Sequence, residues 1–190
     1  PSLYESFKNN QDFEIHWIIL SKATSNELNF SKGDQYFHVI PRAKKTIGLF
    51  SFYAWDRFKI KKKLKEITPD LVHTWGTEDC YGLSGTDFKG SWLHTVQGVL
   101  TACKRVAKLP RFERYQAFYE KKVISKCINI TTESPWAASQ IQKINPNINP
   151  IQWDYAVEDI FFHTEKILSA EPLCVFCGSD TTVKNVDVLI

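Results

Sequence analysis

The sequence predicts an α/β fold, a Rossmann-like parallel sheet with helices on both faces. Between residues 13 and 153, short runs of β-branched and aromatic residues alternate with segments of helical spacing, which is typical of strands that pair in parallel. Residues 68–83 show the pattern most clearly: an apolar run stops at Gly76, and the polar triplet 77–79 follows. Such a strand carries polar side chains to its carboxyl end, where open α/β sheets bind ligands.

The first half of the chain reads as three strands and a basic helix. Residues 2–9 look like the end of a helix, and residues 13–20 and 36–40 are β-branched and aromatic, hence strands. The polar, asparagine-containing stretch between these two strands is expected to form turns. Residues 55–67 carry apolar positions at helical spacing on a lysine-rich background, which predicts a helix with a solvated basic face before the strand 71–74.

The second half continues the alternation. Residues 78–83 should begin a helix, and residues 92–96 form a strand. A basic connection over 99–110 leads to a helix over 112–126, and a strand follows over 128–131.

The next helix has a clear start signal. Ser134 is a helix N-cap and Pro135 occupies the first helical position. This helix runs to about Ile144, and residues 151–153 form a further short strand.

The pattern loosens after residue 164 and restarts with a strand over 173–178. We therefore expect a first domain over residues 1–165, and a linker with the start of a second α/β domain over residues 166–190. The chain contains no methionine and begins without an initiator residue, so we expect a fragment or a chain from which residues are missing.

Composition sets further bounds. A chain of 190 residues with 43% hydrophobic and 24% charged residues is typical of a soluble domain. A net charge of +3 is too small to argue for nucleic-acid binding by itself. No apolar run is long enough to span a bilayer and no signal peptide is recognisable.

The odd number of cysteines, five, indicates reduced thiols in a cytosolic protein. Cys174 and Cys177 lack further ligands at matching spacing, so we expect core residues rather than a zinc site.

Five short motifs stand in a characteristic order. They are Pro69-Asp-Leu-Val-His73 with Gly76-Thr77-Glu78, Thr95-Val-Gln-Gly98, Thr132-Glu-Ser134, Tyr155-Ala-Val-Glu158 with Phe162, and Gly178-Ser179 with Lys184. In this order they resemble the motifs of the GT-B glycosyltransferases of family 4. The resemblance covers almost the whole chain.

The resemblance implies a function. Residues 1–165 would be the acceptor-side domain, and residues 166–190 the beginning of the nucleotide-sugar-binding domain. The enzyme would move a hexose from a nucleotide-diphosphate sugar to a glycan or lipid-linked acceptor, in surface polysaccharide biosynthesis. The nucleotide sugar is a co-substrate, and neither a cofactor nor a metal is expected. The protein would be cytoplasmic, at the inner face of the membrane, and the fragment alone inactive.

The donor side of the site falls on Gly178, Ser179 and Lys184. By resemblance Lys184, at a helix start, faces the diphosphate, whose charge must be neutralised as it leaves. The alternative is a solvated lysine in a first helical turn. Ser179 departs from the family, which usually has arginine there.

The acceptor side falls on the ends of three strands. Gln97 stands where many relatives carry histidine; it does not titrate, but it can hydrogen-bond the transferred sugar. The alternative is a plain strand-end turn that needs Gly98 for its geometry. Glu78 could orient or deprotonate the acceptor hydroxyl, or Thr77 could simply cap the helix with Glu78 behind it.

The remaining polar residues are weaker candidates. By resemblance, Gly76, Thr77, Gly98 and Glu133 would line the cleft. The mid-strand histidines His73 and His94 are expected in the core.

The segment 104–126 carries eight cationic and two acidic residues, a net +6, with Tyr115, Phe118 and Tyr119 interleaved. Such a surface suits an anionic membrane or a lipid-diphosphate acceptor, and a solvated basic surface is the ordinary alternative. No nucleic-acid recognition motif accompanies it.

Two other classes of function stay open. One is a catalytically inert GT-B-like binding module, which Ser179 and Gln97 would fit. The other is a basic α/β domain that binds nucleic acid through residues 104–126.

Overall fold

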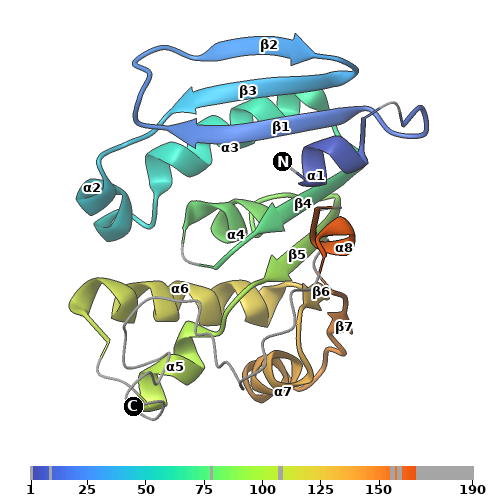
Figure 1. The fold of residues 1–190 in the computed structure, drawn as a ribbon. Coiled ribbons are helices and arrows are strands. Elements are labelled where there is room, and N and C mark those ends of the chain that lie inside the picture. The colour runs from blue at the N-terminus through green and yellow to red at the C-terminus, as the bar shows by residue number, and fades with distance from the viewer. Residues whose placement is uncertain are drawn as a thin grey trace.

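The computed structural model describes residues 2–8, 10–77, 79–106, 109–154, 157 and 160–165. Their strands form two sheets, with the orders β1-β3-β2 and β4-β5-β6-β7 (Figure 1). The strands are β1 (Ile15–Ser21), β2 (Leu28–Lys32), β3 (Gln35–Pro41), β4 (Leu71–Trp75), β5 (Ser91–Val96), β6 (Asn129–Thr132) and β7 (Ile151–Gln152). The helices are α1 (Ser2–Ser6), α2 (Lys45–Phe50), α3 (Ala54–Ile67), α4 (Cys80–Gly85), α5 (Leu100–Val106), α6 (Arg111–Lys126), α7 (Pro135–Ile144) and α8 (Ile160–His163).

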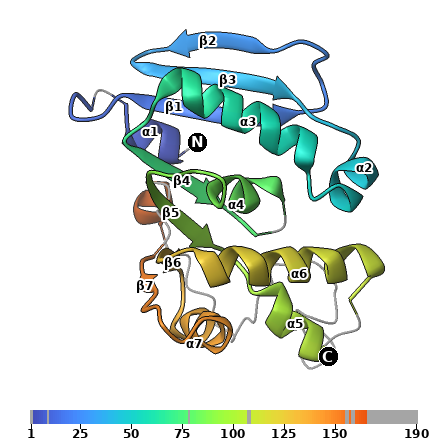
Figure 2. The same ribbon diagram turned by 180° about the vertical axis from the view of Figure 1, so that it is seen from behind.

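The four-stranded sheet is parallel throughout, with β4 on β5, β5 on β6 and β6 on β7. Helix α4 packs on β4 and β5 and against α6, and α7 packs on β7. In both views α8 lies on the opposite side of β4 and β5 from α4 (Figures 1 and 2). The predicted fold class, α/β with a Rossmann-like parallel sheet flanked by helices, is confirmed.

The three-stranded sheet departs from the sequence prediction. Strand β1 pairs with β3 in parallel, but β2 pairs with β3 antiparallel. Strand β2 lies in the segment that was expected to form turns. Its five residues are all exposed, and the alternation of Leu28 and Phe30 with polar residues is too short to predict a strand. Gly33 opens the two-residue loop between β2 and β3 with φ +62°, the left-handed geometry that the first position of a type II′ hairpin turn requires.

The two sheets do not join through strand pairing among the described residues. The backbone N–H of Leu20, in β1, instead donates to the hydroxyl of Tyr81 in α4 at 2.9 Å. Ile18 and Leu20 still pack against the common core. The alternation of elements implied one continuous sheet, but the described residues form two, separated between β1 and β4. At this gap the N–H of Leu20 in β1 donates to the Tyr81 hydroxyl instead of to a neighbouring strand.

The core lies between the four-stranded sheet and helices α4, α6 and α7. Leu83, Val96, Ile124 and Ile141 are fully buried there. Gly85 lets α4 approach the sheet closely, because a Cβ at this position would lie 2.1 Å from the Trp92 ring. The helix-to-sheet spacing is thus set by the absence of one side chain.

The longer helices match their predicted ranges, and the short helices α1 and α4 lie close to theirs, while three other short helices were missed. Ser134 caps α7 as predicted, since its hydroxyl accepts from the Ala137 N–H at 3.2 Å. Helices α2 and α8 were not predicted, and α5 occupies part of the segment that was expected to be a connection. These helices have between four and seven residues, too few to show a periodic pattern.

The basic face of α3 is only partly solvated. Lys63 is 8% exposed, and its ammonium group lies 2.6 Å from Glu27 and 2.7 Å from Glu66. Arg57 binds Asp87 through two hydrogen bonds of 2.7 and 2.6 Å. Both carboxylates outside the helix, Glu27 and Asp87, are remote in sequence, so the pattern of the helix alone did not reveal these pairs.

The two strand histidines have different environments. His94 in β5 is fully buried, as predicted. His73 in β4 is exposed, contrary to the prediction, and its Nε2 atom lies 2.7 Å from the Thr95 hydroxyl.

None of the described helices has both the length and the apolarity that a membrane span demands.

Candidate functional site

The carboxyl ends of β4, β5 and β6 form one rim of the parallel sheet. Trp75, the last residue of β4, pairs with Thr95, and Val96, the last residue of β5, pairs with Thr132, the last of β6. The residues that follow these strands therefore emerge at the same edge. They are Gly76 and Thr77 after β4, Gln97 and Gly98 after β5, and Glu133 after β6.

Gly76 turns the chain at the end of β4. Its φ is +77°, a left-handed conformation that favours glycine over residues with a Cβ. Its N–H donates to the Thr95 carbonyl at 3.0 Å, which extends the contact with β5 by one residue. Gly76 is buried, so it shapes the rim rather than presenting a ligand-binding group.

Thr77 differs from both roles that the sequence suggested for it. Its side chain is only 2% exposed, and its hydroxyl donates to the carboxylate of Glu120 at 3.1 Å. The N-cap of α4 is Asp79, whose carboxylate accepts from the Cys80 N–H at 2.8 Å. Asp79 can cap because its backbone is extended, the conformation usual for this position.

Glu120 joins three elements behind the rim. It is fully buried in α6, and besides Thr77 its carboxylate accepts from the N–H groups of Leu100 and Thr101, each at 2.8 Å. These amides belong to the first turn of α5, which the carboxylate therefore caps. Burial raises the pKa of Glu120 above its ordinary value, while the three donors act in the opposite direction.

Gln97, Gly98 and Glu133 are the accessible part of the rim. Gln97 is exposed, and Gly98 and Glu133 are half-buried. Around Gly98, nothing lies within 4 Å of the position that a Cβ would occupy. Among the residues that the structure describes, neither the Gln97 amide nor the Glu133 carboxylate has a hydrogen bond or ion pair. Both groups are therefore available to a ligand.

The other predicted site residues fall outside the described part of the chain. They are Glu78, Gly178, Ser179 and Lys184. The geometry of the rim therefore rests on the residues that follow β4, β5 and β6.

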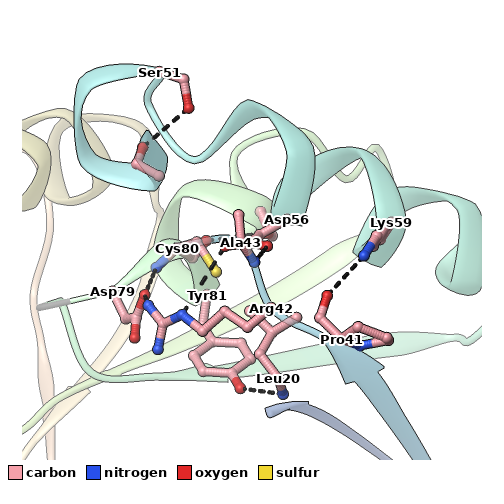
Figure 3. Close-up of polar contacts among 12 residues, drawn as sticks. Leu20, Pro41, Arg42, Ala43, Ser51, Asp56, Lys59, Asp79, Cys80 and Tyr81 are labelled. Carbon is pink, nitrogen blue, oxygen red and sulfur yellow. Dashed lines mark hydrogen bonds and ion pairs between the residues drawn. The ribbon is translucent and has the colours of Figure 1, made fainter. Parts of the chain in front are cut away.

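A second polar cluster lies at the carboxyl end of β3 (Figure 3). The guanidinium group of Arg42 donates to the carboxylate of Asp79, the N-cap of α4. Its Nε atom lies 4.0 Å from the buried Asp56 of α3, which accepts from the Ala43 N–H at 2.9 Å. Desolvation, the largest single cause, lowers the pKa of Arg42, but the hydrogen bond to Asp79 and the nearby negative charges together outweigh it, so the net shift is upward.

This cluster is only partly satisfied. Three of its buried polar atoms have no hydrogen-bond partner among the described residues: Nε of Arg42, Oδ2 of Asp56 and the hydroxyl of Tyr53. Burial also raises the pKa of the neighbouring Cys80 thiol strongly, so this thiol is protonated and unreactive at neutral pH. The cluster holds β3, α3 and α4 together, and these unpaired atoms are buried rather than presented to a ligand.

Sequence reasoning missed Arg42, Asp56 and Glu120. Arg42 follows directly after a strand that ends at Pro41, which is a usable signal for a residue at a sheet edge. Asp56 and Glu120 lie in helices among many charged residues. Nothing in their local sequence distinguishes them from solvated positions.

The chemistry available at the rim is hydrogen bonding by an amide, a carboxylate and backbone groups. Within the described part of the chain, no three histidine, cysteine, aspartate or glutamate side chains could together hold a metal ion. An uncharged ligand rich in hydroxyl groups is the kind of molecule that an amide and a carboxylate bind well.

The fold and the rim define an α/β protein with a Rossmann-like parallel sheet. No model of a known protein family matches the chain. No curated protein matches it either.

Proposed function

We propose that this chain is the acceptor-side half of a GT-B glycosyltransferase, which moves a hexose from a nucleotide-diphosphate sugar to a glycan or lipid-linked acceptor. Surface polysaccharide biosynthesis, at the cytoplasmic face of a membrane, is the setting we infer. The order of the five motifs supports the proposal, and so does a parallel sheet with ligand-accessible groups at its carboxyl edge.

The observation that carries the proposal is the register of β5 and β6. Because Val96 pairs with Thr132, Gln97 and Glu133 follow adjacent strands at one edge. Both side chains are without a partner among the described residues. In an open α/β sheet this edge is the usual place for a ligand.

Gln97 would hydrogen-bond the transferred sugar without exchanging a proton, because an amide does not titrate. The open space at Gly98 would let the sugar approach the backbone. Glu78 would orient the acceptor hydroxyl, and Lys184 with Gly178 and Ser179 would face the departing diphosphate.

The test is turnover of nucleotide sugars by the natural full-length protein. The purified protein is offered a panel of nucleotide-diphosphate hexoses, and the release of nucleoside diphosphate is measured with and without a glycan or lipid-linked acceptor. We expect at least one donor to be consumed. A protein that binds and consumes none of them would contradict the proposal.

Two variants connect the activity with the rim. Gln97→Ala removes the amide, and Gly98→Leu fills the open space beside it. We expect turnover to fall roughly 10-fold or more in each, by the loss of one well-placed hydrogen bond or by steric exclusion. Gln11→Ala is the matched control, because Gln11 is also an exposed glutamine and precedes β1 at the amino end of the strands.

A catalytically inert binding module is the second candidate. The absence of a titratable group at Gln97 favours it, as does serine instead of arginine at position 179. This candidate predicts saturable binding of a glycan or nucleotide sugar, weakened by Gln97→Ala, with no release of nucleoside diphosphate.

A further inference from the structure

A groove with a volume of about 610 Å³ lies on the surface formed by α2, α5 and α6, which are neighbours at one side of the molecule (Figure 1). Its described lining combines three cations with five aromatic rings and includes no carboxylate. The lining residues are Phe50, Phe52, Lys104, Arg111, Arg114, Tyr115, Phe118 and Tyr119. We call it the α2–α6 groove.

Four of the five aromatic side chains of the groove are exposed, and only Tyr119 is buried. Phe50 is 70% exposed, Phe118 55% and Tyr115 47%. Ile47, one turn before Phe50 on α2, adds another apolar side chain that is 61% exposed. Exposed apolar side chains that gather at one site, rather than being scattered singly, mark an interaction surface.

The cations of the groove are free for a partner. Lys104, Arg111 and Arg114 are all exposed. Within the described part of the chain, none of the three forms an ion pair with a carboxylate. Lys122, at the border, lies over the Phe52 ring with its Nζ 5.2 Å from the ring centroid. The groove is therefore positively charged and complementary to an anionic partner.

The chain holds this surface in a strained conformation. Phe52 and Tyr53, between α2 and α3, both have left-handed backbone angles, with φ of +55° and +54°. Such angles are unfavourable for side chains with a Cβ. The turn sends Tyr53 into the core, where it is 1% exposed, and leaves Phe52 40% exposed beside the groove.

We propose that the α2–α6 groove docks on a lipid bilayer that carries anionic phospholipids. Phenylalanine and tyrosine side chains favour the boundary between headgroups and acyl chains, and lysine and arginine beside them attract anionic headgroups. The groove supplies both in one place. Docking rests on the groove alone, and it holds whether or not the protein transfers sugars.

Ring geometry favours a bilayer over nucleic acid. Phe50 and Tyr115 meet edge to face, with interplanar angle 71° and centroids 5.7 Å apart, and Phe52 meets Phe118 at 74°. Proteins that bind single strands offer open ring faces on which successive bases stack. Here the rings pack against one another, which suits insertion into an apolar layer.

The experiment measures cosedimentation of the full chain with vesicles. Vesicles of phosphatidylcholine alone are compared with vesicles of phosphatidylcholine and phosphatidylglycerol in equal parts, at low and at high salt. We expect binding to the anionic vesicles only, weakened by salt because the charges are screened. Glycerol 3-phosphate is added as a competitor, and it should not release the protein if the bilayer itself is the partner.

Two pairs of substitutions separate the charge from the aromatic rings. Arg111→Gln with Arg114→Gln should reduce the partition coefficient roughly 30-fold, since each cation near an anionic surface accounts for about a 5-fold effect. Phe50→Ser with Phe118→Ser should abolish the salt-resistant part of the binding. All four side chains are exposed, so the fold should survive, and circular dichroism checks this.

The matched control removes the same charge elsewhere. Lys61→Gln with Lys65→Gln changes two exposed lysines of α3 that do not line the groove, and binding should change less than about 2-fold. If the control and the groove variants lost vesicle binding equally, net charge alone would explain the binding, and the proposal would be overturned. Binding to single-stranded oligonucleotides but not to vesicles would also overturn it, in favour of nucleic acid. Release by glycerol 3-phosphate would reassign the groove to a soluble phosphate ligand.

Discussion

The hydroxyl of Thr77 donates a hydrogen bond to the carboxylate of Glu120 at 3.1 Å, across 43 residues of sequence. Thr77 follows β4 and Glu120 lies in α6, so this bond ties the sheet edge to the helix that covers it. The same carboxylate accepts from the first amides of α5. Three elements around the rim thus depend on one buried acid.

Glu120→Ala should destabilise the protein by about 3 kcal/mol, because the amides of Leu100 and Thr101 would lose their acceptor inside the protein. Thr77→Val, which keeps the shape of the side chain, should cost only about 1.5 kcal/mol, the worth of one hydrogen bond to a charged group. Urea denaturation measures both, and the double variant should be less destabilised than the sum of the two. Additive effects would mean that the bond contributes nothing.

Arg42→Ala should lower the free energy of unfolding by about 3 kcal/mol, since it leaves the buried Asp56 and the half-buried Asp79 without their cation. Lys62→Ala is the control. Lys62 pairs with Glu66 at 3.9 Å, but its side chain is 71% exposed, and solvent screening should keep its effect within about 0.5 kcal/mol. Chemical denaturation of both variants under one set of conditions makes the comparison. Equal effects would show that burial of the Arg42 cluster does not matter.

The stability should fall with acid because of His94. Trp92 Nε1 donates to the Thr74 hydroxyl at 2.7 Å, and Thr74 in turn lies 2.8 Å from Nδ1 of His94. The Thr74 hydroxyl also lies 3.5 Å from the Leu93 carbonyl oxygen, and Nε2 of His94 has no partner among the described residues. Burial, the largest cause, lowers the pKa of His94 to about 4.

The sign of this dependence follows from proton counting. Between about pH 6.5 and about pH 4, His94 is protonated in the unfolded chain but neutral in the folded protein. The free energy of unfolding therefore decreases as the pH falls through this window. The full contribution is about 3 kcal/mol. His94→Gln, which cannot titrate, should flatten the profile by this amount when the free energy of unfolding is measured at each pH. Parallel profiles of the two proteins would contradict the assignment.

Substitution by alanine should destabilise the protein strongly at Gly85 and hardly at all at Gly98. An added methyl group at Gly85 would lie 2.1 Å from the Trp92 ring, so Gly85→Ala should cost about 3 kcal/mol by forcing α4 away from the sheet. At Gly98 nothing lies within 4 Å of the new Cβ, and Gly98→Ala should change stability by less than about 0.5 kcal/mol. Thermal denaturation compares the two. A large loss at Gly98 would mean that the space beside it is not open.

The sequence located the regular elements wherever the local pattern was long or strongly apolar. Helices α3, α6 and α7 and the strands of the four-stranded sheet lie close to their predicted ranges. The rim at the carboxyl ends of β4, β5 and β6 could be anticipated for the same reason, because parallel strands end at one edge and the residues after each strand are known. Strand β2 and helices α2, α5 and α8 were not predicted because they are short or wholly exposed, so their residue pattern is too brief to identify them.

What the sequence by itself determined is the fold class and the set of residues at the ends of β4, β5 and β6, since both follow from spacing within a few residues. The tertiary structure alone decided which of these residues are free. It paired Thr77 with Glu120 and Arg42 with Asp79, partners that lie 43 and 37 residues apart. Among the described residues it left the side chains of Gln97 and Glu133 without a partner. It also gathered the aromatic rings of α2 and α6 into one groove. Desolvation and hydrogen bonding act between atoms that are close in space, and no local pattern of residues records those distances.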